Sequence, residues 1–241
     1  MEGLNIIAMI PARIGSTRLK MKNLALVNGM PLIYYSIRAA QDSGVFDRVV
    51  LNSDHEVFGE IADRYGAEFY HRPLKLGSSE TKSDDVVMDF MEKNPCDIVA
   101  WVNPTSPLQA GKEVGNVVRF FQKENLDSLI TVKDEQVHCV YRGGAVNFEP
   151  QGKFAQTQDL TPVQSFVYSV MMWRTSKFMS EYREKGYAFF CGRTGTFPVG
   201  RLSGIIIKRQ EDLMLADFIL RSSGDRAYQV LYDEAIRDVE E

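Results

Sequence analysis

The chain has 241 residues, of which 44% are hydrophobic and 25% charged, and its formal net charge is -4 at pH 7. This composition is typical of a soluble globular protein with one substantial core, and the mild acidic balance argues against a nucleic-acid binder. The three cysteines, Cys96, Cys139 and Cys191, stand far apart, which favours a cytoplasmic protein over a disulfide scaffold or a zinc site. Neither a signal peptide nor an apolar run of membrane-spanning length is present, so we expect no membrane partner.

The first two-thirds of the chain alternate strand-like and helix-like patterns. Short apolar runs predict strands at 4–10, 48–51, 68–70, 98–102 and 128–132. Amphipathic stretches between them predict helices at 31–43, 55–65, 83–93 and 111–124. Alternation of this kind is typical of a mostly parallel sheet with helices on both faces. The predicted fold class is therefore α/β, with three α/β/α layers around a Rossmann-like sheet.

The alternation stops near Lys133. Polar residues, the Gly143-Gly144 pair and short extended pieces follow, and we expect an inserted lid or dimerisation segment at about 134–165 within a single domain, 1–241. Beyond the insertion, the pattern predicts a strand at 166–173, a helix at 175–184, an extended stretch through 204–207, a helix ending near Gly224 and a further helix from Asp225.

A cationic loop follows the first predicted strand. Arg13, Arg18, Lys20 and Lys22 lie in this loop, and no Asp or Glu occurs between residues 3 and 41. Ligands of α/β sheets bind at the carboxyl ends of strands, and several clustered cations suit an anion of several charges, such as a nucleoside triphosphate. The patterns of P-loop and dinucleotide-binding proteins are absent. The alternative is a solvated basic loop.

Five segments in order carry a resemblance to a known family. They are Pro11-Ala-Arg-x-Gly-Ser16 with Lys22-Asn23, Gly29–Ile33, Asn52–Asp54, Tyr65–Glu68 with Arg72-Pro73, and Asn103-Pro-Thr-Ser-Pro-Leu-Gln109. With these segments, the chain resembles the CMP-sugar synthetases, the cytidylyltransferases that activate sialic acids and related 2-keto-3-deoxy sugar acids. The Ser16–Leu19 element is also similar to that of the 3-deoxy-octulosonate (Kdo) synthetases.

The resemblance implies roles for particular residues. It implies that Arg13 and Lys22 contact the phosphates of CTP and are catalytic. The other implied nucleotide contacts are Ala12, Gly15, Ser16, Asn23, Arg72, Ser78 and Ser83, and the implied acceptor contacts are Asn103, Ser106, Gln109 and Tyr168. The expected partners are CTP, a sialic-acid-like sugar acid and a second copy of the chain, and the expected cofactor is Mg²⁺.

Several of these residues could instead have a purely structural role. Arg72 could be a loop cation that pairs only with Asp54 or Glu68, and the segment from Asn103 could be only a turn. The two tryptophans, Trp101 and Trp173, lie in apolar strands and are predicted to be core residues rather than stacking platforms.

The metal site is where the chain departs from the family. The family has an Asp-x-Asp pair late in the chain, and the matching positions here are Ile206 and Lys208, before Glu211-Asp212. One hypothesis is that Lys208 replaces the metal as a fixed cation. Another is that Glu211 and Asp212 are displaced ligands, although acids at a helix start more simply complement its dipole. The metal ligands stay unassigned, and the alternative functions are a Kdo-type synthetase and a catalytically silent nucleotide-binding or sugar-binding relative.

Overall fold

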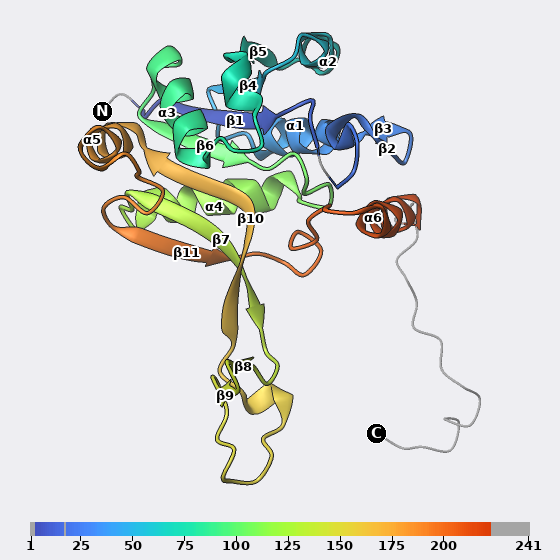
Figure 1. The fold of residues 1–241 in the computed structure, drawn as a ribbon, viewed down its shortest axis with the longest axis vertical. Coiled ribbons are helices and arrows are strands. Elements are labelled where there is room, and N and C mark those ends of the chain that lie inside the picture. Colours follow the sequence, from blue (N-terminus) through green and yellow to red (C-terminus); the bar gives the residue numbers. More distant parts are fainter. Residues whose placement is uncertain (1–2, 17, 223–241) are drawn as a thin grey trace.

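The computed structural model describes residues 3–16 and 18–222. At its centre is a seven-stranded sheet in the order β11-β7-β10-β6-β1-β4-β5 (Figure 1). The strands are β1 (Ile6–Ala12), β4 (Arg48–Ser53), β5 (Glu68–His71), β6 (Ile98–Val102), β7 (Ser128–Glu135), β10 (Val163–Arg174) and β11 (Thr194–Pro198). Of the described strands in this sheet, β10 alone runs antiparallel to its neighbours. The predicted α/β fold class is confirmed.

Helices cover both faces of the sheet (Figure 1). One face carries α1 (Leu32–Ser43), α2 (Val57–Tyr65) and α4 (Gly111–Lys123), and the other carries α3 (Ser83–Lys93) and α5 (Thr175–Lys185). In β1, Ala8 and Ile10 face the first layer, whereas Ile7 and Met9 face the second. Burial on both faces explains why this strand is a continuous apolar run.

The last described helix, α6 (Gln210–Ser222), lies at the side of this body. It packs with the small hairpin formed by β2 (Leu26–Val27) and β3 (Met30–Pro31). Among the described helices, none is both long and apolar enough to cross a membrane.

Most element boundaries lie within two residues of the predicted ones. The largest difference is near the end of the described chain, where the predicted extended stretch at 204–207 forms no strand and β11 occupies the sheet edge instead. The small and polar residues of β11 carry no apolar strand pattern, and its pairing with β7 is a tertiary contact that sequence periodicity does not reveal. The helix expected from Asp225 lies outside the described residues.

The order of the strands reverses beside β1. The chain proceeds from β1 outward to β4 and β5, and then returns to β6 on the other side of β1. The loops after β1 and β6 therefore diverge at the carboxyl ends of these strands. Such a crevice is the usual ligand site of an open α/β sheet.

Strands β7 and β10 continue beyond the sheet as a two-stranded arm that projects from the body (Figure 1). The arm contains a short hairpin, β8 (Val140–Tyr141) with β9 (Gly144–Ala145), and the turn η3 (Thr157–Asp159). It occupies the segment where an insertion at about 134–165 is expected. That this arm acts as a lid or in dimerisation remains a prediction.

Candidate active site

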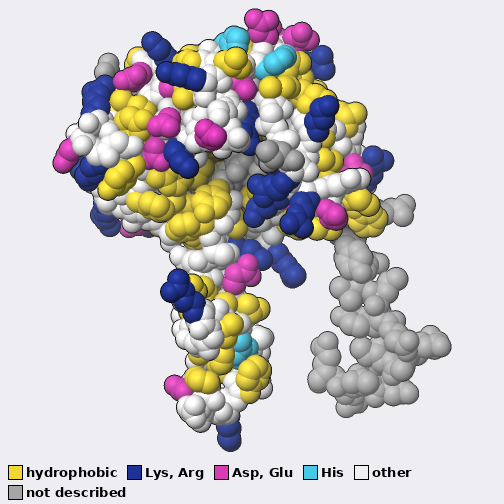
Figure 2. Space-filling view, in the orientation of Figure 1, with side chains coloured by type: hydrophobic (Ala, Val, Ile, Leu, Met, Phe, Trp, Pro, Cys, Tyr) yellow, Lys and Arg dark blue, Asp and Glu magenta, His cyan; other side chains and the backbone are white. Residues whose placement is uncertain are grey.

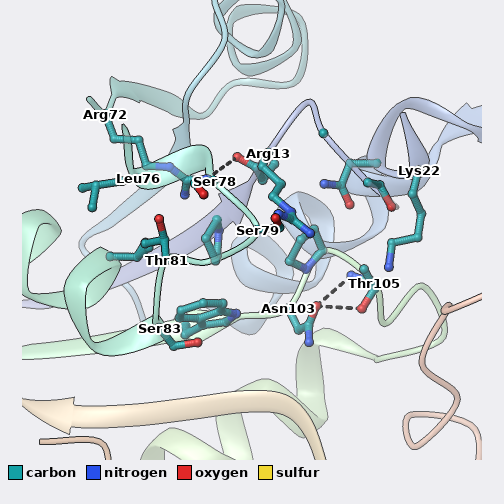
Figure 3. A pocket seen from close by; sticks show the side chains of 18 of the residues that line it. Arg13, Lys22, Arg72, Leu76, Ser78, Ser79, Thr81, Ser83, Asn103 and Thr105 are labelled. Atoms are coloured by element: carbon teal, nitrogen blue, oxygen red, sulfur yellow. Dashed lines mark hydrogen bonds between the residues drawn. The ribbon is translucent and has the colours of Figure 1, made fainter. Parts of the chain in front are cut away.

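A cavity of about 300 Å³ opens in the crevice between the loops that follow β1 and β6 (Figure 3). Arg13 and Lys22 reach it from the segment after β1, Arg72 from the end of β5, and Asn103 from the end of β6. The other predicted residues that line it are Ala12, Gly15, Ser16, Asn23, Ser78 and Ser83. The structure thus gathers in one cavity every residue that the sequence predicts to contact the nucleotide.

The charged side chains that line this cavity are all positive. They are Arg13, Arg18, Lys22 and Arg72, and no Asp or Glu occurs among the described lining residues. Burial and the nearby charges of Arg18 and Arg13 lower the pKa of Lys22 to about 8. A polyanion bound in the cavity would raise the pKa of Lys22, because its negative charges would stabilise the protonated lysine beside the two arginines.

Arg72 is part of the cavity wall and also ties strand ends together. Its side chain is 4% exposed and donates to main-chain carbonyls at the ends of β1 and β4, at 3.2 and 3.4 Å. Its guanidinium lies 3.9 Å from Asp54, and burial lowers its pKa. Glu68, the other partner considered, pairs with Arg48 at 2.6 Å. The sequence left open whether Arg72 contacts a ligand or only pairs with an acid such as Asp54. In the structure Arg72 lines the cavity and also lies beside Asp54.

Asp54 holds two walls of the cavity in place. Its Oδ1 accepts the main-chain N–H of Ile14 at 3.2 Å, which fixes the loop after β1. On the other side, a Cβ added at Gly77 would lie 2.0 Å from Oδ2 of Asp54. The short helix η2 (Leu74–Gly77) can therefore approach Asp54 only because its last residue is glycine. This approach brings the segment that begins at Ser78 to the cavity.

Asn103 connects the cavity to an irregularity in β10. Its Oδ1 accepts hydrogen bonds from the main-chain N–H and the hydroxyl of Thr105, at 3.0 and 2.8 Å, which builds the predicted turn. Its Nδ2 donates to the carbonyl of Tyr168 at 3.0 Å. Tyr168 lies in a bulge between Phe166 and Met171 and has a φ of 56°. A tyrosine in the left-handed region is uncommon, and bulges with such residues occur preferentially beside functional sites.

A second cavity shares a wall with the first. Both cavities are lined by Ser83, Trp101 and Asn103. The rest of the second cavity is largely aromatic, with Phe166, Tyr168, Phe189 and Phe190. Among its described lining residues Lys82 is the one cation and Asp84 the one acid. Oδ1 of Asp84 accepts the main-chain N–H groups of Ala188 and Phe189 at 2.7 and 2.9 Å. Figure 2 shows hydrophobic side chains gathered on the body just above the base of the arm.

Trp101 corrects the prediction that both tryptophans are core residues. Trp173 is fully buried, as predicted, and its indole donates to the carbonyl of Phe189 at 2.8 Å. Trp101 instead lines both cavities, and its buried Nε1 has no hydrogen-bond partner among the described residues. The difference arises because Trp101 is near the carboxyl end of β6, where the protein opens toward the crevice. The sequence signal that could have placed Trp101 at the cavity is its position two residues before Asn103, where the predicted turn begins.

Two predicted acceptor contacts do not reach either cavity. Gln109 is 6% exposed and donates from Nε2 to the hydroxyl of Ser169 at 3.2 Å. Ser106 is 1% exposed. Neither side chain is among the described residues that line the two cavities. Of the predicted acceptor contacts, Asn103 and Tyr168 are the ones that the structure brings to the crevice.

No carboxylate is among the described residues that line the nucleotide cavity, so the described side chains there do not fit a protein-held Mg²⁺. Such an ion prefers carboxylate oxygens, yet the described residues contain no cluster of three or more Asp, Glu, His or Cys side chains that could hold a metal. At the start of α6, Oδ2 of Asp212 accepts the main-chain N–H groups of Lys208 and Arg209, at 2.7 and 2.8 Å. Asp212 therefore caps the helix, which is the simpler of the roles considered for it.

Comparison with known proteins places this geometry in a family. The family model described as "Cytidylyltransferase" matches residues 7–182. N-acylneuraminate cytidylyltransferase A of Danio rerio is 33% identical over 150 residues, which are 61% of this chain and 35% of that protein. An N-acylneuraminate cytidylyltransferase of Streptococcus agalactiae is 24% identical over 239 residues, which are 92% of this chain and 56% of that protein. The chain thus spans between about a third and just over half of the length of these relatives.

Solved structures show the same fold. The CMP:2-keto-3-deoxy-manno-octonic acid synthetase complexed with CTP has a TM-score of 0.69 at 15% identity and covers 90% of this chain and 99% of its own. The 4-diphosphocytidyl-2C-methyl-D-erythritol synthase of Anaerococcus prevotii has a TM-score of 0.65 at 15% identity and covers 91% of this chain and 100% of its own. The match to the family model extends over well more than half of the chain, so this chain belongs to the cytidylyltransferase family.

Proposed function

We propose that this chain is a nucleotidyltransferase that transfers CMP from CTP to a 2-keto-3-deoxy sugar acid and releases pyrophosphate. The observation that carries the proposal is the pair of adjoining cavities, one cationic and one aromatic, that share Ser83, Trp101 and Asn103. Two substrates bound in these cavities would meet at the shared wall. The relatives, which are N-acylneuraminate cytidylyltransferases, agree with this pairing.

The cationic cavity suits the triphosphate of CTP. Arg13 and Lys22 would contact its phosphates and neutralise the charge that develops on the leaving pyrophosphate. Buried polar atoms also point to a ligand there, because Oδ1 of Asn23 and Nε1 of Trp101 have no hydrogen-bond partner among the described residues. Such atoms are costly to bury unless a ligand or water pairs with them.

The aromatic cavity suits the sugar acid. Its apolar side chains can pack against the carbon skeleton and acyl groups of a nonulosonate, and Lys82 supplies a cation for the carboxylate. Larger apolar substituents distinguish sialic-acid-like acceptors from octulosonate. We therefore prefer a sialic-acid-like acceptor, with octulosonate as the alternative.

In the proposed reaction, the anomeric hydroxyl oxygen of the acceptor forms a bond to the α-phosphorus of CTP. The bond from this phosphorus to the oxygen that bridges to the β-phosphate breaks, and pyrophosphate leaves with that electron pair while the hydroxyl proton is released. The residues of this chain contribute mainly by holding the two reactants in line and by stabilising negative charge.

We further propose that the chain acts in the cytoplasm, where CTP is available, and as a homodimer. The arm supports the second proposal, because Val140, Tyr141 and Phe154 lie on it and are 67%, 67% and 80% exposed. Exposed apolar side chains on a projecting hairpin are typical of a surface that packs against a partner. A second copy of the chain could thereby cover the aromatic cavity at the base of the arm.

The proposal is tested by measuring pyrophosphate release from CTP with a panel of acceptors, with and without Mg²⁺. The panel contains N-acetylneuraminate, legionaminate-type and pseudaminate-type acids, and Kdo. We expect release with one nonulosonate and loss of release in Arg13→Ala. Release with Kdo alone would select the alternative substrate. A protein that binds CTP but releases no pyrophosphate with any acceptor would be the silent relative.

A further inference from the structure

The positive charge around the nucleotide cavity extends to Lys208. Ile207, its neighbour, is fully buried against Val27 and Leu32, and its main-chain N–H donates to the carbonyl of Thr105 at 2.9 Å. The carbonyl of Ile207 in turn accepts a hydrogen bond from Nζ of Lys22 at 2.8 Å. The segment that carries Lys208 is therefore fixed beside the cavity by contacts to two of its lining residues.

The charge of Lys208 acts on the cavity. Together with Arg13 and Arg18, it lowers the pKa of Lys22, whereas Asp212 is the acid whose charge opposes them. Asp212 is already engaged, because its Oδ2 accepts the main-chain N–H groups of Lys208 and Arg209, just before α6. Figure 2 shows Lys and Arg side chains gathered on the body beside α6.

Asp212 is the one acid among the charges that act on Lys22, and it is not among the described residues that line the cavity. The described lining of the cavity holds no Asp or Glu, and the positions before α6 are Ile206 and Lys208. A triphosphate carries several negative charges at neutral pH. Its binding requires that these charges be neutralised, by a metal, by side chains, or by both.

We propose that this chain neutralises the triphosphate of its nucleotide with the side chains of Arg13, Arg18, Lys22 and Lys208, in place of a divalent ion held by the protein. Lys208 directly follows Ile207, whose carbonyl accepts a hydrogen bond from Lys22, and this place at the edge of the cavity would give it the phosphates as its partner. The metal-free nucleotide is then the form that binds best, because Mg²⁺ cancels part of the charge that these cations recognise. This inference rests on the proposed function in one respect, namely that the nucleotide is CTP.

The test is calorimetric binding of CTP to the full chain in EDTA and in excess Mg²⁺, without any acceptor. We expect CTP to bind at least as tightly in EDTA as in Mg²⁺. In EDTA, Lys208→Ala should weaken binding about tenfold, the loss expected for one charge-assisted contact. Arg209→Ala, which removes the adjacent exposed cation, is the matched control and should change the dissociation constant less than about twofold.

A second variant reverses the preference. Ile206→Asp combined with Lys208→Asp removes the cation and adds two carboxylates on the surface beside the cavity. We expect this variant to bind CTP weakly in EDTA and to recover affinity when Mg²⁺ is added. Thermal unfolding in the absence of ligand checks that Lys208→Ala and the double variant are folded.

Inorganic tripolyphosphate separates this inference from the proposed function. Binding of tripolyphosphate in EDTA that Lys208→Ala weakens supports the inference even if CTP shows no advantage over other nucleoside triphosphates, which would count against the proposed function alone. Binding of CTP and tripolyphosphate only in the presence of Mg²⁺ would overturn the inference. Equal losses in Lys208→Ala and Arg209→Ala would overturn it as well, because the effect would then be one of general surface charge.

Discussion

Lys22 is the residue whose protonation state would report on the proposed binding of a nucleotide. Its pKa is lowered to about 8 by burial and by neighbouring cations, and a bound triphosphate raises that pKa because it favours the charged form. Above pH 8 the free protein must therefore take up a proton to bind. We predict that the dissociation constant for CTP rises by up to about tenfold per pH unit above pH 8.

Calorimetry at a series of pH values, in buffers of different ionisation enthalpy, measures both the affinity and the proton uptake. Lys22→Arg is the control, because a guanidinium stays protonated over this range and should flatten the profile. An unchanged affinity up to about pH 10 in the unmodified chain would contradict the assignment of Lys22 to the phosphates.

Arg72 and Arg48 form a natural pair for comparing buried and exposed charges. Arg72 is 4% exposed and bonds to two main-chain carbonyls near Asp54, whereas Arg48 and Glu68 form an ion pair at the surface. We predict that Arg72→Ala lowers the free energy of unfolding by about 3 kcal/mol. Arg48→Ala should lower it by less than about 1 kcal/mol. Urea denaturation checks both values, and similar losses would show that Arg72 is not a structural tie.

The sequence predicted the residues of the cationic cavity better than those of the aromatic cavity. The cationic loop that contains Arg13 and Lys22 was predictable from a local signal, because it stands directly after a predicted strand. The resemblance to the family implied the other proposed nucleotide contacts, such as Arg72 and Ser78. The acceptor side depends on tertiary contacts that no local pattern contains. Lys82 and Trp101 line the aromatic cavity together with residues of the β10 bulge, which are distant from them in the sequence. Gln109 stands in a matching motif but is buried in the protein.

At the scale of elements, the close approach of η2 to Asp54 is the tightest fit in the site. A Cβ at Gly77 would lie 2.0 Å from Oδ2 and 2.5 Å from Cγ of Asp54. We predict that Gly77→Ala displaces η2, costs about 1–3 kcal/mol of stability and weakens CTP binding. Gly152→Ala on the arm, where the nearest atom is 3.9 Å away, should leave both unchanged. Wild-type affinity in Gly77→Ala would mean that η2 does not shape the cavity.

The helices and central strands were predictable because their signals are local. The helix at 83–93 and the strand at 98–102 have the predicted bounds, since apolar periodicity and a following proline or turn define both. The edge strand β11 and the hairpin of β2 and β3 were not predicted. The strand β11 forms through pairing with β7, which is distant in the sequence. The hairpin has a local signal, the Asn28-Gly29 turn, in which both residues have positive φ, but its two-residue strands are too short to carry an apolar pattern of their own.

At the scale of the whole molecule, the arm projects from the body, and it is the feature on which the proposed dimer rests. Replacing residues 136–162 by a short turn would keep the part of β7 and β10 that lies within the sheet. We predict that this variant is monomeric while the full chain is dimeric, and that it still binds CTP because the arm contributes nothing to the described lining of the nucleotide cavity. Sedimentation velocity measures the oligomeric state. A full chain that sediments as a monomer would contradict the proposed dimer.

The central claim of this account is that the two adjoining cavities bring an acceptor hydroxyl to the α-phosphorus of CTP. Phosphorus NMR of CTP mixed with the protein and each acceptor tests it most directly, because it follows that phosphorus atom itself. We predict that the signals of CTP are replaced by a phosphodiester signal and a pyrophosphate signal of twice its intensity, because pyrophosphate has two equivalent phosphorus atoms. An α-phosphate signal that persists with every acceptor, in protein shown to bind CTP, would contradict the account.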